Sequence, residues 1–430
     1  MDRTKIETWI RELKTHLSQE LLPFWLARCW DSTNGGYLTQ YDGDGKDTGL
    51  DEKSLLAHMR MIYALSLAYR KGNGGEQCRQ FAEQGVTYAV EHYWDHAHGG
   101  FYWLFNRKGE PTITKKIVYG HSFAIYALSH YTLATGDPRG LEYAEKCFDL
   151  LQKYAAETSC GGYWEIFERD WRLCGPGAAG GDRKTLDVHM HLMEAFTALY
   201  ECSGQDIHRR KLEEVIQILL EKILHPVHGT GIPQFFRDWR VAPQIKFDII
   251  WGWDRFDGET QQKPHDDNTS YGHNVEFFWL LLEAFRVLGT DVTPHRPLFN
   301  KILRHAVDHG VDWELGGVYV EGSLDGSRVY DNAKEFWQQA EFMVGMPDAY
   351  RLFGDDRYLA AYGNVHDFVM QKMIKHEIGE WLPLLTREGK PIWTHMSHSW
   401  KVNYHTVRAV VLAIEKWERL LADAHPAANP

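Results

Sequence analysis

The sequence has no surplus of basic residues and no long apolar run. It contains 47 lysines and arginines against 59 aspartates and glutamates, which gives a net charge of −12 at pH 7. Without basic residues to neutralise phosphates, nucleic acids and anionic membranes are not expected partners. No segment approaches the roughly 20 apolar residues of a membrane helix. No apolar stretch follows the first five residues, so a signal peptide is not expected.

Cysteine is scarce. The six cysteines all lie in the first half of the chain, and no two of them form a CxxC motif. A disulfide framework is therefore not expected, and scattered reduced thiols predict a cytoplasmic protein.

Aromatic residues, in contrast, are abundant. The chain has 17 Trp, 21 Tyr and 20 Phe, together with 23 His, while 44% hydrophobic and 25% charged residues are typical of a globular protein. Aromatic rings stack on the apolar faces of sugars, so carbohydrate is a natural ligand class. A large aromatic core is the alternative explanation.

A Gly-rich turn followed by aromatic or apolar residues recurs along the chain, which indicates an internal repeat. The turns start 64, 62, 68, 87 and 63 residues apart and comprise Gly35-Gly36-Tyr37, Gly99-Gly100-Phe101, Gly161-Gly162-Tyr163, Gly229-Thr230-Gly231, Gly316-Gly317-Val318 and Gly379-Glu380-Trp381.

Between these turns the apolar spacing predicts paired amphipathic helices. Their ranges are 5–24, 52–71, 76–94, 118–135, 139–156, 184–203, 207–224, 270–288, 297–310, 331–352, 356–373 and 400–423. Six helical hairpins could form an open solenoid, but a solenoid needs atypical polar capping repeats, and the last helix resembles the middle ones. We therefore expect an all-α fold, an (α/α)6 barrel with short β-strands in the connecting loops, as one catalytic domain over 1–430.

One repeat is about twenty residues too long. The surplus lies in 240–268, and loops of this length are commonly functional or disordered. This segment contains Trp251, Trp253 and Asp254, and its tryptophans argue against disorder. We expect it near the rim of the active site, where it could cover a sugar and restrict the substrate to monosaccharides.

The starts of alternate helices, which would form the inner ring, carry a set of polar side chains. One comparable position holds Arg60, Ser122, His191, His273, Gln338 and His405, and three residues after four of these come Glu194, Glu276, Glu341 and Arg408. Positions i and i+3 share a helix face, so the barrel would aim imidazoles and carboxylates at one axial pocket.

Three explanations compete for these histidines. A single histidine on an amphipathic helix is usually a satisfied core residue, but three at matched repeat positions are not typical of a core. Metal ligation is disfavoured because His189 and His191 point to different helix faces and no HExxH occurs. Proton transfer near pH 7 fits imidazole best, and two proton carriers on opposite faces of one carbon can invert a stereocentre.

These residues lie in segments that resemble the N-acylglucosamine 2-epimerase superfamily, within it the cellobiose 2-epimerase and mannose 2-epimerase branch. The matching segments span nearly the whole chain and are GGYWEIFERDW (161–171), LDVHMHLMEAFTALYE (186–201), SYGHNVEFFWLLLEA (270–284), KEFWQQAEFMVG (334–345) and WKVNYHTVRA (400–409). The resemblance implies an (α/α)6 barrel without a metal or nicotinamide cofactor.

The resemblance also implies roles for individual residues. His405 would remove the C2 proton, and His273 would act as acid or base on the opposite face with support from Glu276. His191 would assist ring opening and polarise O1, and Arg60 would hold oxygens of the open-chain sugar. The expected substrate contacts are Tyr119, Trp337, Trp400, Glu341, Arg408 and Asp254.

The expected activity is 2-epimerisation of free aldoses, mannose and glucose foremost, through a cis-enediolate. The alternatives are a cellobiose 2-epimerase and a mannose–fructose isomerase. This chain has Phe336-Trp337 where cellobiose 2-epimerases usually carry Trp-Trp, which favours a monosaccharide. An inverting glycoside hydrolase using Glu276 and Glu341 and a non-catalytic sugar-binding module are further alternatives. We expect a monomer or homodimer.

Overall fold

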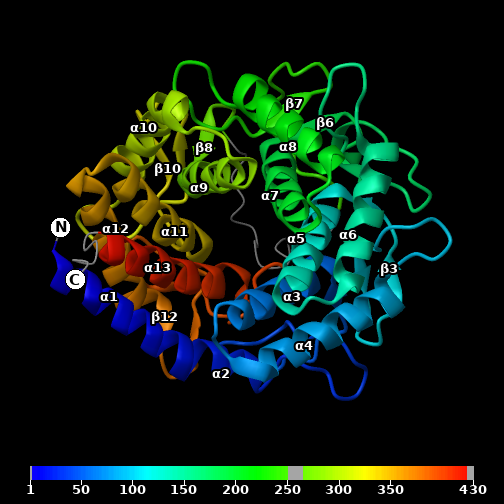
Figure 1. Cartoon of the computed structure of the whole chain (residues 1–430), viewed down its shortest axis with the longest axis horizontal. Coiled ribbons are helices and arrows are strands. Elements are labelled where there is room, and N and C mark those ends of the chain that lie inside the picture. The colour runs from blue at the N-terminus through cyan, green and yellow to red at the C-terminus, as the bar shows by residue number, and fades with distance from the viewer. Residues whose placement is uncertain (1, 250–264, 424–430) are drawn as a thin grey trace, which may run out of the picture.

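The helices form two concentric rings around one axis (Figure 1). The structure is a computed structural model that describes residues 2–249 and 265–423. The inner ring consists of α3 (Leu55–Arg70), α5 (Val118–Thr135), α7 (Leu186–Ser203), α9 (Tyr271–Leu288), α11 (Phe336–Phe353) and α13 (Asn403–Asp423). The outer ring consists of α1 (Arg3–His16), α4 (Gly75–Tyr88), α6 (Pro138–Leu150), α8 (Asp206–Ile218), α10 (Arg296–His305) and α12 (Asp356–Phe368).

The inner ring is closed. Each inner helix contacts the next one, and α13 returns to α3. The outer helix α1 packs against α13, so the first and last helices form the sixth pair (Figure 1). The predicted (α/α)6 barrel is thus confirmed, and the open solenoid is wrong.

Each outer helix widens into one π-helical turn at its carboxyl end and leads on to a Gly-rich turn. These π turns span Leu17–Leu21, Ala89–Tyr93, Leu151–Ala155, Leu219–Ile223, Ala306–Gly310 and Val369–Met373, and the first continues into α2 (Leu22–Leu26). Within the described residues, no helix combines the length and apolarity needed to cross a membrane.

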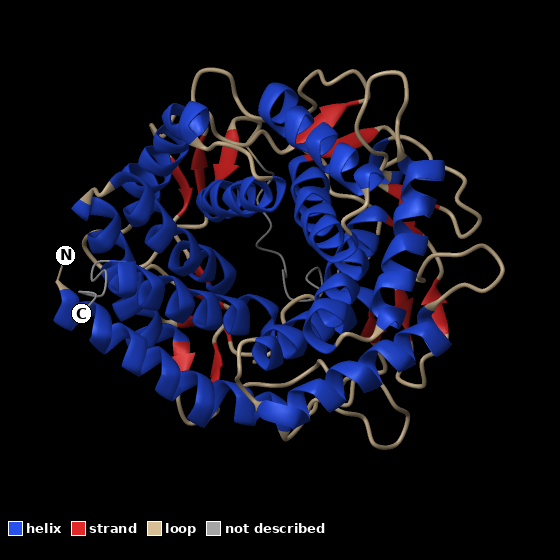
Figure 2. Ribbon diagram, in the orientation of Figure 1, coloured by secondary structure: helices blue, strands red, loops and turns tan. Residues whose placement is uncertain are grey.

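Short antiparallel strands connect neighbouring repeats (Figure 2). The strands are β1 (Lys53–Ser54), β2 (Leu104–Phe105), β3 (Pro111–Ile113), β4 (Lys116–Ile117), β5 (Ile166–Phe167), β6 (Arg183–Thr185), β7 (Gln234–Phe236), β8 (Asn268–Ser270), β9 (Glu321–Ser323), β10 (Val329–Asp331), β11 (Lys334–Glu335), β12 (Ile374–Lys375), β13 (Glu380–Trp381), β14 (Leu384–Leu385) and β15 (Pro391–Trp393). They pair in the orders β1-β2-β3, β4-β5, β6-β7, β10-β9-β8, β11-β14-β15 and β12-β13.

Several inner helices begin later than predicted because a strand ends directly before them. The ranges 52–71, 184–203 and 331–352 included β1, β6 and β11, which pair with the following repeat. Ser54, Thr185 and Ser270 then cap α3, α7 and α9 with their hydroxyl oxygens. This change from extended backbone to helix aims the first helical turns at the barrel axis.

Five buried lysines that precede inner helices tie the Gly-rich turns to the barrel. Each ammonium lies 3.1–3.4 Å from a buried carboxylate, in the pairs Lys53–Asp31, Lys116–Asp95, Lys184–Glu157, Lys334–Asp312 and Lys401–Glu380. Removing the carboxylate would leave the buried ammonium without its counter-ion, so each pair stabilises the start of an inner helix.

The long connection lies partly outside the described residues. Its described ends approach each other, since the amide of Gln244 donates to the carbonyl oxygen of His265 at 3.0 Å. They lead from β7 to β8, beside the amino end of α9. Residues 250–264, with Trp251, Trp253 and Asp254, are not described, so their role as a cover remains a prediction.

Candidate active site

The amino-terminal halves of the six inner helices carry the predicted site residues. The structure positions Arg60 on α3, Tyr119 on α5, His191 on α7, His273 and Glu276 on α9, Trp337 and Glu341 on α11, Trp400 directly before α13, and His405 and Arg408 on α13. Asp254 lies outside the described residues.

The ring positions compared in the sequence differ in depth. Arg60 and His191 are the sixth residues of their helices, whereas His273, Gln338 and His405 are the third. Gln338 has a structural partner, because its side-chain oxygen accepts the backbone N–H of Gly272 at 2.9 Å. The residues aligned by repeat period are therefore not equivalent in three dimensions.

A fully buried arginine forms the centre of the site. The Nη1 of Arg408 donates to Glu194 at 2.8 Å, and its Nη2 donates to Glu276 at 2.9 Å and Glu341 at 2.6 Å. These three carboxylates come from α7, α9 and α11. One guanidinium thus joins four inner helices through charge-assisted hydrogen bonds, which are stronger than neutral ones.

Two of these carboxylates hold histidines. The Nδ1 of His191 lies 2.8 Å from Glu194, and the Nδ1 of His405 lies 2.8 Å from Glu341. A carboxylate accepts a proton in such a bond, so Nδ1–H donates, and a neutral ring then carries its lone pair on Nε2. His191 and His405 therefore share one tautomer.

Burial and neighbouring charges shift the pKa values of Glu276, Glu341 and His405 in different directions. Burial, followed by the neighbouring Glu341 carboxylate, raises the pKa of Glu276 well above its ordinary value. Burial opposes ionisation of Glu341 as well, but Arg408 and His405 outweigh it and lower its pKa to about 2. Burial, with smaller contributions from Arg408 and Arg60, lowers the pKa of His405 to about 3. His405 is consequently neutral near pH 7 and can accept a proton.

His273 and His405 both lie near the ring of Trp337. The ring of Trp337 has its centroid 4.6 Å from the His273 ring and 6.0 Å from the His405 ring. The side chain of His273 is 24% exposed, and its Nε2 lies 3.6 Å from Asp187. Burial lowers the pKa of His273, and the Asp187 carboxylate opposes this shift. The bond that the structure gives Glu276 runs to Arg408, so its support of His273 remains a prediction.

A wall of aromatic rings and Arg60 lies on the other side of the site. Tyr119 and Trp400 stack at 5.4 Å with an interplanar angle of 5°. Arg60 donates from Nη1 to the Trp400 carbonyl oxygen at 2.6 Å and from Nη2 to the Tyr119 hydroxyl at 3.2 Å. The edge of Tyr119 meets the His191 ring at 5.1 Å. Arg60 is thus held by hydrogen bonds to Trp400 and Tyr119, and its contact with substrate oxygens remains a prediction.

Among the described residues, two groups of side chains have the composition of metal sites. Ligand atoms of Glu276, Glu341 and His405 lie within 4.8 Å of one another, but Arg408 already places a cation between the two carboxylates. Their separation is also smaller than the roughly 6.5–9.5 Å of an inverting glycosidase. This geometry disfavours both a metal site and the hydrolase alternative.

The second group, His16, Glu20 and His376, lies in the outer layer. The indole N–H of Trp381 donates to Nε2 of His16 at 3.0 Å, so the proton of a neutral His16 sits on Nδ1 and faces Glu20 at 2.7 Å. A metal on that Nδ1 would bring two N–H groups together, which disfavours ligation.

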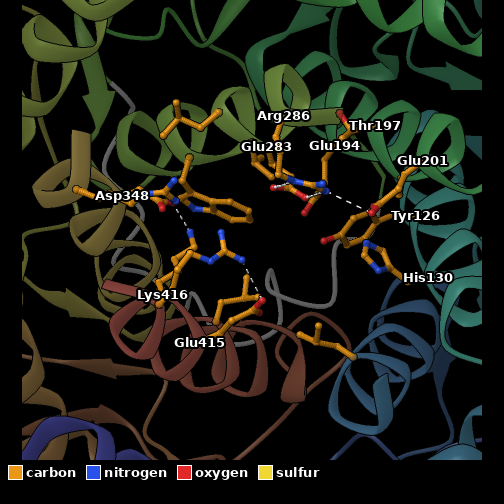
Figure 3. A pocket seen from close by; sticks show the side chains of 18 of the residues that line it. Tyr126, His130, Glu194, Thr197, Glu201, Glu283, Arg286, Asp348, Glu415 and Lys416 are labelled. Carbon is orange, nitrogen blue, oxygen red and sulfur yellow. Dashed lines mark hydrogen bonds and ion pairs between the residues drawn. The ribbon is translucent and has the colours of Figure 1, made fainter. Parts of the chain in front are cut away.

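A cavity of about 670 Å³ lies at the opposite, carboxyl end of the inner helices (Figure 3). Its rim contains ion pairs between helices, such as Lys416–Asp348 and Arg286–Glu201, and Glu194 reaches it from the central group. None of the predicted catalytic histidines is among its described lining residues. The charged group around Arg408 thus separates the histidine end of the barrel from this cavity.

Sequence reasoning missed three members of the site. Tyr404 donates from its hydroxyl to Glu194 at 2.9 Å and accepts from Arg408. Asp187 approaches His273, and Phe123 packs on His191 at 4.8 Å and under the Arg60 guanidinium at 4.5 Å. Tyr404 lies four residues before Arg408, so helical spacing contained a signal for it, whereas Asp187 reaches His273 only through the packing of α7 against α9.

Known proteins resemble this chain over nearly its whole length. The family model for N-acylglucosamine 2-epimerase (GlcNAc 2-epimerase) matches residues 36–409. A cellobiose 2-epimerase from Bacteroides fragilis is 31% identical over 411 residues, which covers 93% of this chain and 97% of that protein. A D-mannose isomerase from Thermobifida fusca is 22% identical over 347 residues and covers 79% of each chain.

Among solved structures, the cellobiose 2-epimerase from Spirochaeta thermophila DSM 6192 superimposes with a TM-score of 0.84 at 28% identity. The match covers 97% of this chain and 99% of that one. The similarity therefore includes both rings of helices and the connections that carry the site.

Proposed function

Since this chain belongs to the N-acylglucosamine 2-epimerase family and is a sugar 2-epimerase of that family, we propose that it epimerises the reducing-end glucose of β-1,4-linked disaccharides such as cellobiose. The names of the two cellobiose 2-epimerases above favour this substrate over the free mannose and glucose expected from sequence. We keep mannose–glucose epimerisation as the second candidate.

The substitution of Trp by Phe at residue 336 no longer argues against a disaccharide. Phe336 is 1% exposed and packs edge-on against His405 at 5.7 Å. A ring buried in this way supports the catalytic histidine and offers no open face to a second sugar unit. Trp337, which is partly exposed, remains the proposed stacking platform.

The proposed reaction breaks one C–H bond and forms another at the same carbon. After ring opening, His405 accepts the C2 proton through Nε2, and the electrons form a cis-enediolate. His273, which enters this step as the imidazolium, then delivers its proton to the opposite face of C2 and becomes neutral. His191 polarises O1, and Arg60 holds substrate oxygens with its guanidinium. The reverse reaction uses the two histidines in exchanged roles, and proton exchange with water restores the starting state.

One observation carries this proposal: imidazoles from α7, α9 and α13 converge at one end of the barrel, and two are held by carboxylates through Nδ1. We infer that these imidazoles can act as acid and base on two sides of a bound sugar carbon. A sugar-binding module would have no need for two imidazoles oriented by carboxylates.

The test is turnover of cellobiose and mannose, each in heavy water, followed by chromatography and NMR of the products. We expect cellobiose to yield glucosyl-mannose with deuterium at C2 and to react faster than mannose. A ketose product would indicate the isomerase alternative, and faster turnover of mannose would favour the second candidate. If neither sugar reacts, the proposal is wrong.

A further inference from the structure

Arg408 is buried beneath the histidines rather than exposed to a sugar. It is 0% exposed, and its Nη1 and Nη2 nitrogens both bond to carboxylates. Its guanidinium also lies over the Trp279 ring at 4.8 Å and the Tyr404 ring at 4.2 Å. These contacts occupy both Nη nitrogens, and Nε has no hydrogen-bond partner among the described residues but is buried, so the group is poorly suited to the substrate contact predicted from sequence.

The geometry of Arg408 determines which way the carboxylates point. The two hydrogens of Nη2 bond to Glu276 and Glu341, and the remaining lone pairs of Glu341 accept from Nδ1 of His405 and from the Trp279 indole N–H at 2.9 Å. Although Nδ1 of His405 lies only 3.4 Å from Nη2, both Nη2 hydrogens are already used. Nδ1 must therefore donate its proton to Glu341, which leaves Nε2 as the base.

The same arginine acts on the second histidine through another carboxylate. Glu194 accepts from Nη1 of Arg408 and from the Tyr404 hydroxyl through Oε1, and its other oxygen bonds to Nδ1 of His191. The planar guanidinium of an arginine has five N–H donors and can bridge carboxylates from several helices. The ammonium of a lysine cannot fix the orientation of these carboxylates in the same way.

We propose that Arg408 is a positioning residue that holds both His191 and His405 in the tautomer with a basic Nε2, by way of Glu194 and Glu341. This inference rests on the proposed epimerase function and deepens it. Without the guanidinium, three buried carboxylates would lie together with no counter-ion, and protonation would relieve their repulsion. A protonated Glu341 or Glu194 no longer dictates the position of the imidazole proton.

The test compares Arg408→Gln and Arg408→Lys with the matched control Arg419→Gln. Arg419 lies on the same helix and lines the 670 Å³ cavity, but its side chain is 50% exposed in its ion pair with Glu415. We expect Arg408→Gln to lower kcat about a hundredfold with KM changed less than threefold. Arg419→Gln should leave both constants unchanged.

The pH profile separates positioning from a general loss of structure. The positive charge of Arg408 helps to lower the pKa of His405. Its removal should therefore shift the acid limb of kcat/KM to higher pH, by about one unit. In Arg408→Ala, millimolar guanidinium should restore at least tenfold activity, because the cavity beside Glu194 and Trp279 gives it a route to the vacated space.

The outcomes distinguish the two proposals. If wild-type enzyme turns over sugar but folded Arg408→Gln retains its kcat and pH profile, or loses only substrate affinity, positioning is wrong and the proposed function stands. If wild-type enzyme turns over no sugar, the function itself fails. Should Arg408→Gln not fold, Arg408→Lys keeps the buried charge, and an unchanged kcat there would overturn the inference.

Discussion

Two histidines only two residues apart on α7 belong to different regions of the molecule. His189 lies in the layer between inner and outer helices, where Nδ1 bonds to the Thr185 carbonyl oxygen at 2.8 Å and Nε2 accepts the Tyr163 N–H at 3.1 Å. His191 faces the axis and bonds to Glu194. Both ring nitrogens of His189 are hydrogen-bonded to backbone groups. The ring of His191 is oriented by a carboxylate through Nδ1, which leaves Nε2 available for proton transfer.

The layer between the rings repeats this structural role around the barrel. His121, Asn274 and Gln339 each accept the backbone N–H of a residue at or after a Gly-rich turn, as His189 does. Gly162 has φ +84°, and a Cβ there would lie 2.8 Å from the His189 ring. The Gly-rich turns are thus shaped to receive these side chains.

A low pKa does not distinguish the two regions. Burial lowers the pKa of His189 to about 4 and that of His405 to about 3. The type of hydrogen-bond partner differs, and it indicates which histidine can act on a substrate. The following variants and measurements test this distinction.

The largest expected effect is that of His405→Asn. Because the axial ring is the proposed C2 base, kcat should fall at least about a hundredfold with the helical circular dichroism retained. Steady-state kinetics on cellobiose and mannose measure the loss. If the variant retained a tenth of wild-type activity, His405 would have a structural role like that of His189, and the proposed difference between the two regions would be wrong.

The pH dependence of the wild-type enzyme gives the next effect. His405 must be neutral to accept a proton, and its pKa is lowered to about 3. As pH falls from 7 through the ordinary histidine pKa near 6.5, kcat/KM should therefore stay nearly constant while the protein remains folded. An acid limb centred at 6.5, with circular dichroism unchanged, would contradict a buried neutral base.

His189→Ala tests the region between the rings. It leaves the buried Tyr163 N–H without its acceptor, so unfolding free energy should drop by about 1–3 kcal/mol, while kcat changes less than threefold. Urea unfolding and kinetics on the same samples measure both. His189→Asn is the matched control and should recover part of the stability, since Asn274 has this role in the fourth repeat.

The smallest expected effect is that of a chelator. Arg408 already supplies the cation between Glu276 and Glu341, so EDTA should leave activity unchanged. Loss of activity with EDTA and its recovery on adding a divalent metal would show that the axial group binds an ion and would require a different account of its charge.

The repeat period was sufficient to predict the barrel and the helices that line its axis. Gly-rich turns at intervals of 62 to 68 residues, with one interval of 87, and apolar spacing depend on local sequence, and the inner ring follows from taking every second helix. Local spacing did not predict where some helices begin, such as α11 at Phe336. The residues before it form β11, which is held extended by pairing with β14, a strand about fifty residues later in the sequence.

The sequence by itself determined that imidazoles and carboxylates at matched repeat positions would face one axis, because helical periodicity sets which side chains share a face. Only the tertiary structure decided which of these groups touch. Closing the ring brings α13 against α11 and near α7, so Arg408 meets Glu194 more than two hundred residues away. Glu276 bonds to that arginine, and Asp187 approaches His273 instead. Partners so far apart in sequence leave no local pattern, since their distances depend on how six helices pack around one point.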